Sequence, residues 1–277
     1  MFAEVEFRLA GGENPLILVP TMVNDRGPYP FILDTGAGTS LLSPRLADEL
    51  GVATGGSREG TGAGGKVTVS LGTVSSIAIG GARRAPMPVA ITGEVDRIGA
   101  AVGARIDGDV GYDFLKDFRA TIDYRKRTIR LAQGAYDVTG GPARSEIPFR
   151  LANPNKPLVM VTTFVNRRGP YAFVVDTGAS ATVLSPELAD ALGIERTDRS
   201  PLTGAGGTLQ TTTSRIGSLV VGTAKLEDLA VVVSDFLGTI GQALGAQVDG
   251  VVGYNFLRGF RVTIDYPNSR LWLERAA

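Results

Sequence analysis

The chain has 277 residues, a formal net charge of zero at pH 7 and an apolar fraction of 43%, which is enough for two domains with ordinary hydrophobic cores. It contains neither cysteine nor histidine, which excludes thiol nucleophiles, serine–histidine–aspartate triads, disulfides and zinc sites built from these residues. Basic residues do not gather with aromatic ones, and apolar runs are shorter than the ~20 residues of a membrane span, so we expect neither a nucleic-acid partner nor a membrane span.

The N-terminal residues, from Met1 to Phe7, lack the basic and then apolar segments of a signal peptide. We expect a cytoplasmic protein if the chain is taken as it stands, and a periplasmic or secreted one if a leader has been removed. The lack of disulfides does not separate these locations, because many exported proteins have none.

The first half begins with elements typical of a β-rich domain. Leu16–Val23 is apolar and rich in β-branched residues, which predicts a buried strand. Arg26-Gly-Pro-Tyr predicts a turn, and Pro30–Asp34 predicts the next strand. Ser43–Leu50 predicts a short helix, because serine can cap the first turn, proline suits the first helical position and glycine, here Gly51, suits the position after the end.

Further strands in the first half are joined by a glycine-rich turn at Gly62, Ala63, Gly64 and Gly65. Asp96–Ala104 predicts a short helix, and Ala120–Leu131 predicts a closing hairpin. Asp107 precedes a glycine and is expected to form a turn, whereas Asp123 in the hairpin is expected to face solvent.

The second half of the sequence repeats the first. The pairs of matching motifs begin at Phe7 and Phe149, Arg26 and Arg168, Asp34 and Asp176, Gly62 and Gly204, and Thr121 and Thr263. The members of every pair are 142 positions apart, which indicates a tandem duplication of a domain-sized unit without net insertion. Gly134–Pro148 is the expected linker.

The second copy therefore predicts the elements of the first. These are strands over Leu158–Val165 and Ala172–Asp176, helices over Ser185–Leu192 and Phe236–Ala246, a glycine-rich turn at Gly204, Ala205, Gly206 and Gly207, and a hairpin over Val262–Leu273. Asp249 is expected to form a turn and Asp265 to face solvent. The expected fold is all-β (mainly β with short helices), with two lobes over residues 1–140 and 141–277 related by a pseudo-twofold axis and forming a cleft.

Each copy has an apolar strand that ends in an aspartate, Asp34 in the first and Asp176 in the second. A twofold axis places equivalent residues opposite each other, so these carboxylates are expected to meet. Two close carboxylates share a proton, because like charges disfavour the second ionisation. Such a pair can activate a water as general base and protonate an amide nitrogen as general acid, so we predict that both aspartates are catalytic, without a cofactor or a metal.

The residues after each aspartate fit this role. Gly36 and Gly178 allow backbone to approach the carboxylates. Thr35 and Thr177 are expected to hydrogen-bond across the axis and to hold the dyad rigid. In the alternative reading, the aspartates are ordinary turn residues and the threonines cap local backbone.

Each half resembles one subunit of the retropepsin-like aspartic proteases, particularly the bacterial members. The matching segments are Ile32–Ala37, Gly62–Gly65 and Asp109–Leu115 in the first copy, and Val174–Ala179, Gly204–Gly207 and Val251–Leu257 in the second. The resemblance implies an aspartic endopeptidase that hydrolyses peptide bonds through a water held between Asp34 and Asp176. It also implies a monomer that acts as an internal pseudo-dimer on a peptide or protein substrate.

The resemblance further implies which residues lie next to the substrate. The glycine-rich turns of the two copies would be flaps that close over it, although they can also be read as ordinary hairpin turns. Ala37 and Ala179 would lie beside the dyad, where pepsin-like enzymes often carry a serine or threonine. Without that hydroxyl, the pKa values of the dyad are expected to be higher.

The sequence departs from the retroviral pattern near the dyad. The usual acidic residue after Asp-Thr-Gly-Ala is replaced by Gly38 and Ser180, and its usual arginine partner is replaced by Tyr112 and Tyr254. Asp109 stands where the second copy has the apolar Val251. This third carboxylate is expected to raise the pKa values of the dyad or to weaken activity.

Two other functions are compatible with these residues. The departures fit a protease-like scaffold that binds peptides or protein partners without cleaving them. A glycosidase also uses two carboxylates, but these stand ~5–9.5 Å apart, whereas the oxygens of a proton-sharing dyad are ~3 Å apart. The separation of Asp34 and Asp176 distinguishes these two chemistries.

Overall fold

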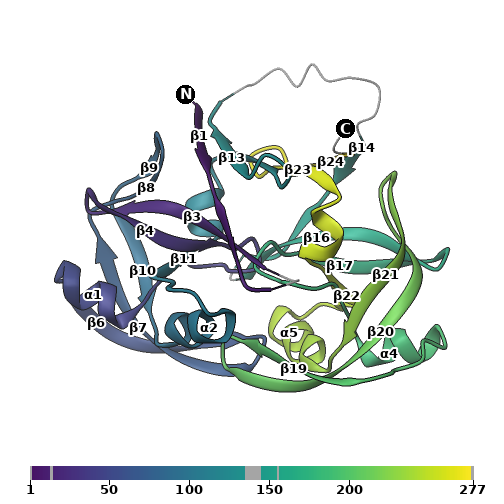
Figure 1. Cartoon of the computed structure of the whole chain (residues 1–277). Coiled ribbons are helices and arrows are strands. Elements are labelled where there is room, and N and C mark those ends of the chain that lie inside the picture. Colours follow the sequence, from purple (N-terminus) through teal and green to yellow (C-terminus); the bar gives the residue numbers. More distant parts are fainter. Residues whose placement is uncertain (1, 13–14, 135–144, 155, 276–277) are drawn as a thin grey trace.

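The computed structural model describes residues 2–12, 15–134, 145–154 and 156–275. The chain is mostly β-strand with short helices, and its two halves stand side by side as two lobes (Figure 1). This confirms the expected all-β class and the duplicated architecture. The expected boundary between residues 140 and 141, and most of the expected linker, lie outside the described residues.

The first lobe is built on a mixed sheet. Its strands are β2 (Arg8–Ala10), β3 (Leu16–Val23), β4 (Arg26–Leu33), β5 (Leu41–Leu42), β6 (Thr54–Gly62), β7 (Gly65–Val74), β8 (Ile77–Ile79), β9 (Ala82–Arg84), β10 (Met87–Ile91) and β11 (Gly108–Val110). They follow the order β6-β7-β10-β5-β11-β4-β3-β8-β9, with β2 paired to β3. Its helices are α1 (Pro44–Leu50), α2 (Glu94–Val102) and α3 (Tyr112–Leu115).

The second lobe repeats this plan. Its strands are β15 (Arg150–Asn153), β16 (Lys156–Val165), β17 (Arg168–Val175), β18 (Val183–Leu184), β19 (Arg199–Gly204), β20 (Gly207–Val221), β21 (Ala224–Val233) and β22 (Gly250–Val252). They follow the order β15-β16-β17-β22-β18-β21-β20-β19. Its helices are α4 (Pro186–Ala191), α5 (Phe236–Leu244) and α6 (Tyr254–Leu257).

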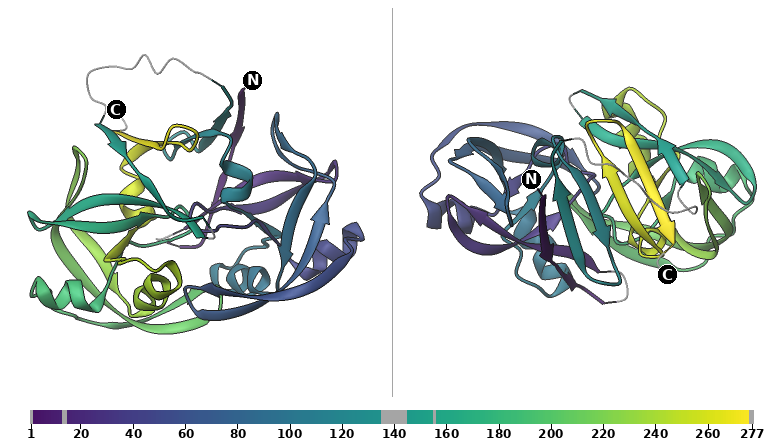
Figure 2. Two further views of the ribbon diagram at one scale, coloured as in Figure 1. Left: turned by 180° about the vertical axis from the view of Figure 1, so that it is seen from behind. Right: turned by 90° about the horizontal axis from the view of Figure 1, so that it is seen from above.

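A third sheet joins the lobes. Its strands are β1 (Phe2–Glu6), β12 (Arg119–Asp123), β13 (Thr128–Ala132), β14 (Ser145–Pro148), β23 (Phe260–Asp265) and β24 (Arg270–Arg275). Their order is β1-β13-β12-β23-β24-β14, and the view from above in Figure 2 shows the teal strands of the first lobe beside the yellow strands of the second. Thr121 of β12 lies opposite its own repeat, Thr263 of β23, with their hydroxyl oxygens 3.0 Å apart. A residue that faces its own copy marks the pseudo-twofold axis.

The helix after the first aspartate loop is formed as its sequence predicts. The Ser43 hydroxyl accepts a hydrogen bond of 3.2 Å from the Leu46 amide, and Gly51 ends α1 with a φ of 63°. Ser185 caps α4 in the same way. Both helices pack a leucine and an alanine into the core, so the segment that follows each aspartate is fixed to the body of its lobe.

One expectation about local structure is wrong. Arg26-Gly-Pro-Tyr lies inside β4, and the turn before it is formed by Asn24 and Asp25, with φ values of 52° and 60°. This is because a two-residue hairpin turn that matches strand twist needs positive φ at both positions, which asparagine and aspartate tolerate. The helix expected over Asp96–Ala104 is present as α2, with both ends two residues earlier.

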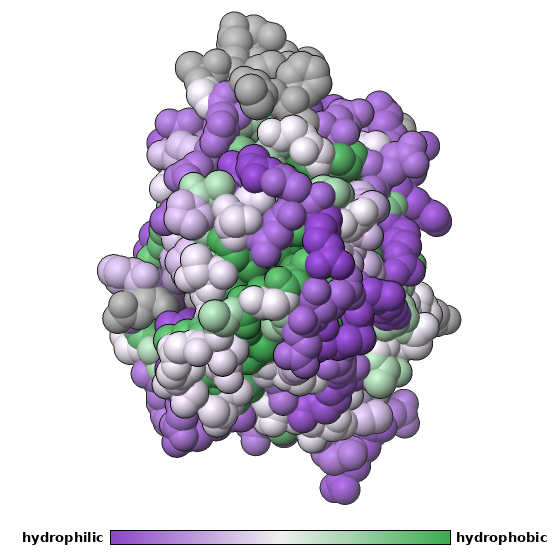
Figure 3. Space-filling view, turned by 90° about the vertical axis from the view of Figure 1, so that its left-hand side faces the viewer, coloured by the Kyte–Doolittle hydropathy of each residue, from purple (hydrophilic) through white to green (hydrophobic). Residues whose placement is uncertain are grey.

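The hydrophobic core runs from one lobe into the other. Buried residues of both lobes and of the third sheet form one cluster, and separate apolar clusters include residues of α2 in the first lobe and α5 in the second. Tyr254 and Trp272 are both buried. On the side of the molecule shown in Figure 3, hydrophobic residues gather in the middle and hydrophilic ones surround them.

Several acidic residues have roles that differ from those expected. Asp265 does not face solvent: it is 1% exposed and pairs with Arg119 of the other lobe, with Nε and Oδ2 2.8 Å apart. Asp107 is fully buried and paired with Arg45 and Arg105, so it is not a turn residue. Asp249 is also buried, and it accepts a hydrogen bond from a β17 amide. Asp123 is half-buried.

The helices of the described segments include none that is long and apolar enough to cross a membrane.

Candidate active site

The two aspartates lie at the ends of equivalent strands. Asp34 follows β4, and its amide donates a hydrogen bond of 3.1 Å to the Val110 carbonyl of β11. Asp176 follows β17, and its amide donates a bond of the same length to the Val252 carbonyl of β22. Because β4 and β11 are parallel, as are β17 and β22, each aspartate loop emerges beside the end of a second buried strand.

The two carboxyl groups are in contact across the pseudo-twofold axis. A Cβ atom added to Gly36 would lie 2.5 Å from Oδ2 of Asp176, and one added to Gly178 would lie 2.5 Å from Cγ of Asp34. Each carboxyl group therefore packs against the glycine of the opposite loop, where a larger residue would displace it. Asp34 and Asp176 are close enough to hydrogen-bond through their side chains.

Backbone amides also hold the carboxyl groups in place. Oδ1 of Asp34 accepts a hydrogen bond of 2.7 Å from the Gly36 amide. Oδ1 of Asp176 accepts bonds of 2.8 Å from Gly178 and 3.1 Å from Ala179. Burial raises the pKa of Asp176 well above its usual range, and the charge of Asp34 and a hydrogen bond to it act in the same direction, against the two amide bonds.

The threonines that follow the aspartates bind the opposite lobe. The Thr35 hydroxyl donates to the Val175 carbonyl over 2.9 Å and accepts from the Thr177 amide over 3.1 Å. The Thr177 hydroxyl donates to the Leu33 carbonyl over 2.7 Å and accepts from the Thr35 amide over 3.1 Å. Both residues are almost fully buried. Each loop is thus held by the other, in the arrangement that the sequence analysis expects.

Asp109 brings a third carboxyl group to the site. It lies on β11 beside β4, one residue before the carbonyl that binds the Asp34 amide, and it is 4% exposed. Burial raises its pKa well above its usual range, and so do the charge of Asp34, a hydrogen bond to Asp34 and the charge of Asp176. The site therefore contains three adjoining acids and no symmetric partner for the third.

The glycine-rich turns of the two lobes meet at their tips. The turn between β6 and β7 touches the turn between β19 and β20, and the Gly64 amide donates a hydrogen bond of 2.8 Å to the Ala205 carbonyl. A Cβ atom on Gly62, Gly64 or Gly206 would overlap backbone of the opposite turn. The two backbones can approach this closely only because these positions carry no side chain.

Side chains from the body of each lobe hold the glycine-rich hairpin of the other. Glu94 of α2 accepts a hydrogen bond of 2.7 Å from the Gly206 amide, and Arg97 of α2 donates one of 3.2 Å to the Gly204 carbonyl. Glu94 and Arg97 also form an ion pair with each other. Lys156 of β16 donates a bond of 3.2 Å to the Thr61 carbonyl at the end of β6 in the first lobe. These three residues were not anticipated from the sequence, since their contacts depend on how the lobes face each other.

The residues expected to lie beside the dyad support the loops by their backbone. The Ala37 carbonyl accepts a hydrogen bond of 2.8 Å from the Tyr112 amide, and the Ala179 carbonyl accepts one of the same length from the Tyr254 amide. These bonds connect each aspartate loop to the short helix α3 or α6. In the part of the chain that the structure describes, no group of three or more acidic residues is arranged to hold a metal ion.

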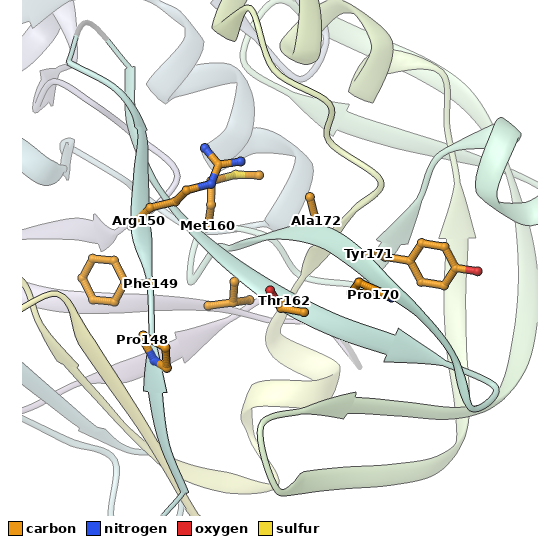
Figure 4. Close-up of a pocket in the computed structure, with 9 residues that line it drawn as sticks. Pro148, Phe149, Arg150, Met160, Thr162, Pro170, Tyr171 and Ala172 are labelled. Carbon is orange, nitrogen blue, oxygen red and sulfur yellow. The ribbon is translucent and has the colours of Figure 1, made fainter.

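Open grooves elsewhere on the surface contain none of these residues. One, of about 460 Å³, is lined by residues at the end of β14, in β15, in β16 and in β17, and Arg150 extends toward Met160 (Figure 4). An equivalent groove of about 360 Å³ lies in the first lobe. Neither groove is lined by Asp34 or Asp176, so the candidate active site is placed at the contact of these two aspartates.

The contact between the two glycine-rich turns gives a first testable prediction. Gly64→Ala places a methyl group against the backbone of the opposite turn, so the tips of the turns are expected to separate. We expect faster exchange of the Ala205–Gly207 amides with deuterium, measured by mass spectrometry, and an unchanged melting temperature. Gly60→Ala is the matched control, because a Cβ atom there meets only the Val67 carbonyl, at 3.8 Å. Equal exchange in both variants would contradict the contact.

Comparison with known families gives an independent result. A family model described as aspartyl protease matches the chain twice, over residues 19–114 and 161–256. The matched segments contain both aspartate loops and both glycine-rich turns, and together they cover more than half of the chain. A search of curated proteins found no match.

Proposed function

The chain belongs to the aspartyl protease family, and from this we propose that it is an endopeptidase in which Asp34 and Asp176, one from each lobe, activate the water that cleaves the peptide bond. The observation that carries the proposal is the contact of the two carboxyl groups across the pseudo-twofold axis. This contact favours a proton-sharing dyad over a glycosidase, whose carboxylates stand ~5–9.5 Å apart.

The proposed reaction needs one ionised and one protonated carboxyl group. The ionised group takes a proton from water as the water oxygen bonds to the peptide carbonyl carbon, and the protonated group gives its proton to the carbonyl oxygen. When the carbon–nitrogen bond breaks, the nitrogen takes the proton that came from water, and a hydroxyl of the tetrahedral diol returns a proton to the other carboxyl group. One water is consumed and the dyad regains its starting state.

The flaps supply the proposed substrate contacts. Gly62–Gly65 and Gly204–Gly207 carry backbone amides and carbonyls that can pair with an extended peptide, as an added strand pairs with a sheet edge. Since the flap tips touch, a substrate enters after they part and is enclosed when they close again. The side chains of Ala37 and Ala179, which lie beside the dyad in this proposal, are small methyl groups.

Peptide-library cleavage across a range of pH tests this proposal. We expect internal cleavage of extended peptides, and fragments identified by mass spectrometry would give the preferred residues on each side of the cut. Release of terminal residues alone would contradict an endopeptidase. Binding of peptides without any fragments would instead favour the second candidate, a peptide-binding scaffold, for which the buried third acid Asp109 is the specific argument.

The pH dependence of cleavage is a second prediction. The raised pKa of Asp176 means that the dyad keeps its shared proton to higher pH, and neither Ala37 nor Ala179 offers a hydroxyl to stabilise the ionised pair. We therefore expect kcat/KM to be highest in mildly acidic to neutral solution. Ala37→Ser, which adds a hydroxyl beside the dyad, is expected to move the profile to lower pH. A wild-type optimum near about pH 2–3 would refute the prediction.

A further inference from the structure

Asp109 distinguishes the two lobes at the dyad itself. Its repeat in the second lobe is Val251, which packs among apolar residues such as Val174 and Val183. The neighbours of Asp109 on the sheet are also apolar, since it lies in register with Ile32 of β4 and Leu41 of β5. An acid has thus replaced an aliphatic side chain at a buried position, which is costly unless the acid has a strong partner.

The partner of Asp109 is Asp34. Their side chains are in hydrogen-bonding contact, and Oδ1 of Asp109, among the described residues, is buried without any hydrogen-bond partner. An ionised carboxylate in this position would leave a charged oxygen unsolvated and would face a second carboxylate. A neutral carboxylic acid needs a single acceptor for its proton, and the oxygens of Asp34 supply it.

The surrounding charges also favour the neutral form. The ionisable groups that act most strongly on Asp109 are other acids: Asp34, Asp176 and Asp113 of α3. The arginines on nearby segments of the first lobe are already paired, Arg97 with Glu94 and Arg105 with Asp107. Burial and these acids together hold the pKa of Asp109 well above its usual range.

We propose that Asp109 is a positioning residue that, as a neutral acid, donates a hydrogen bond to Asp34, so that Asp34 carries the negative charge of the dyad and Asp176 holds the proton. The proposal rests on the proposed function and assigns a role to each lobe. Asp34 takes the proton of the attacking water, and Asp176 protonates the carbonyl oxygen of the peptide. Asp109 itself exchanges no proton with the substrate.

The hydrogen bonds at the dyad bear on this assignment. Without Asp109, the backbone would favour charge on Asp176, because its Oδ1 accepts two amide bonds and that of Asp34 accepts one. The additional bond at Asp176 is the longer, at 3.1 Å. Bonds from an amide and from a carboxylic acid to a carboxylate are both charge-assisted, but the O–H bond of the acid is the shorter and stronger, at ~2.5–2.7 Å. The donor from Asp109 therefore outweighs the extra amide and reverses the preference.

The test compares the pH profile of kcat/KM in wild type, Asp109→Val and Asp109→Asn. Valine is the residue of the second lobe and offers no donor, so the acidic limb of the profile is expected to move up by about one pH unit, a tenfold loss of kcat/KM on that limb. Asparagine keeps an N–H donor and is expected to keep the limb near its wild-type position. Asp48→Asn is the matched control, since it makes the same chemical change at an exposed position of α1, and it is expected to leave the limb unchanged.

The alternatives give different results. If Asp109 were ionised, removing its charge would move the acidic limb to lower pH in both variants, which would overturn the proposal. If the residue only filled space, the two variants would share the wild-type profile, which would overturn it as well. Equal upward shifts in the valine and asparagine variants would also count against a donated hydrogen bond.

A second measurement does not depend on activity and so separates this proposal from the proposed function. The carboxyl carbon of Asp109, followed by ¹³C NMR in the wild-type protein, is expected to keep the chemical shift of a protonated acid at pH 7. The raised pKa also means that Asp109 contributes stability that is complete below the pKa of an unfolded aspartate, about 3.9, and is lost as the pH rises through the folded pKa. The melting temperature of Asp109→Asn, relative to that of wild type at the same pH, should therefore rise between pH 4 and pH 7. An ionised Asp109 signal at pH 7 would refute the proposal even if the protein cleaves peptides.

Discussion

Asp34→Asn and Asp176→Asn are each expected to lower peptide hydrolysis by on the order of 10³–10⁴-fold, because a dyad that shares one proton has no function when either carboxyl group is replaced by an amide. Asparagine has nearly the same shape and can accept the hydrogen bonds from the Gly36 or Gly178 amide through its carbonyl oxygen. The fold should therefore survive. Single-turnover cleavage of a fluorogenic peptide and a melting curve measure the two effects separately.

Asp48→Asn is the matched control for the dyad variants. It makes the same chemical change on an exposed position of α1, away from the dyad, and should leave both activity and melting temperature unchanged. A variant of Asp34 or Asp176 that keeps most of its activity would show that the two residues do not act as a pair. Loss of activity together with loss of folding would point to a structural role instead.

Thr35→Val and Thr177→Val are expected to weaken both the fold and the activity. Each change removes a buried hydroxyl that donates to one backbone group of the opposite lobe and accepts from another. The amide of the other threonine is then left without that acceptor, at a cost of roughly 1–3 kcal/mol in the free energy of unfolding. Because the aspartate loops lose their mutual support, we also expect kcat to fall by on the order of 10²-fold.

Serine variants separate the hydroxyl from the methyl group. Thr35→Ser and Thr177→Ser keep the donor and the acceptor, so they should retain most of the stability and activity in urea unfolding and cleavage assays. Valine variants as stable as the serine ones would contradict the view that the hydrogen bonds across the axis hold the lobes together. The double valine variant is informative too, because the four bonds form one network and their losses need not add.

The sequence contains enough information to predict the fold and where the dyad lies. Five pairs of matching motifs, each 142 positions apart, predict two similar lobes with a pseudo-twofold relation, and residues near a twofold axis meet their own repeats. The contacts of Asp34 with Asp176, and of Thr35 with Thr177, follow from that relation. Their catalytic and supporting roles stay predictions until the variants are measured.

Other features could not be read from the sequence because they depend on partners far along the chain. Asp265 was expected in solvent, yet Arg119 lies opposite it once β12 pairs with β23. Glu94 and Arg97 hydrogen-bond to the glycine-rich hairpin of the other lobe. Their repeats are Phe236 and Thr239, so comparing the two copies does not predict this polar contact. The hairpin turn was predicted at the glycine–proline pair of Arg26-Gly-Pro-Tyr, although Asn24 and Asp25 form it.

Covalent union of the two lobes has a consequence for how a peptide would lie between them. A peptide runs from an amino to a carboxyl end, and a site with perfect twofold symmetry receives it equally well in either orientation. Here the first lobe has an acid at Asp109 where the second has the aliphatic Val251. The ion pair of Glu94 and Arg97, which contacts the second-lobe hairpin, is replaced in the second lobe by the uncharged Phe236 and Thr239. The two orientations of a peptide between the lobes are therefore not equivalent, because each end of the peptide would contact a chemically different lobe.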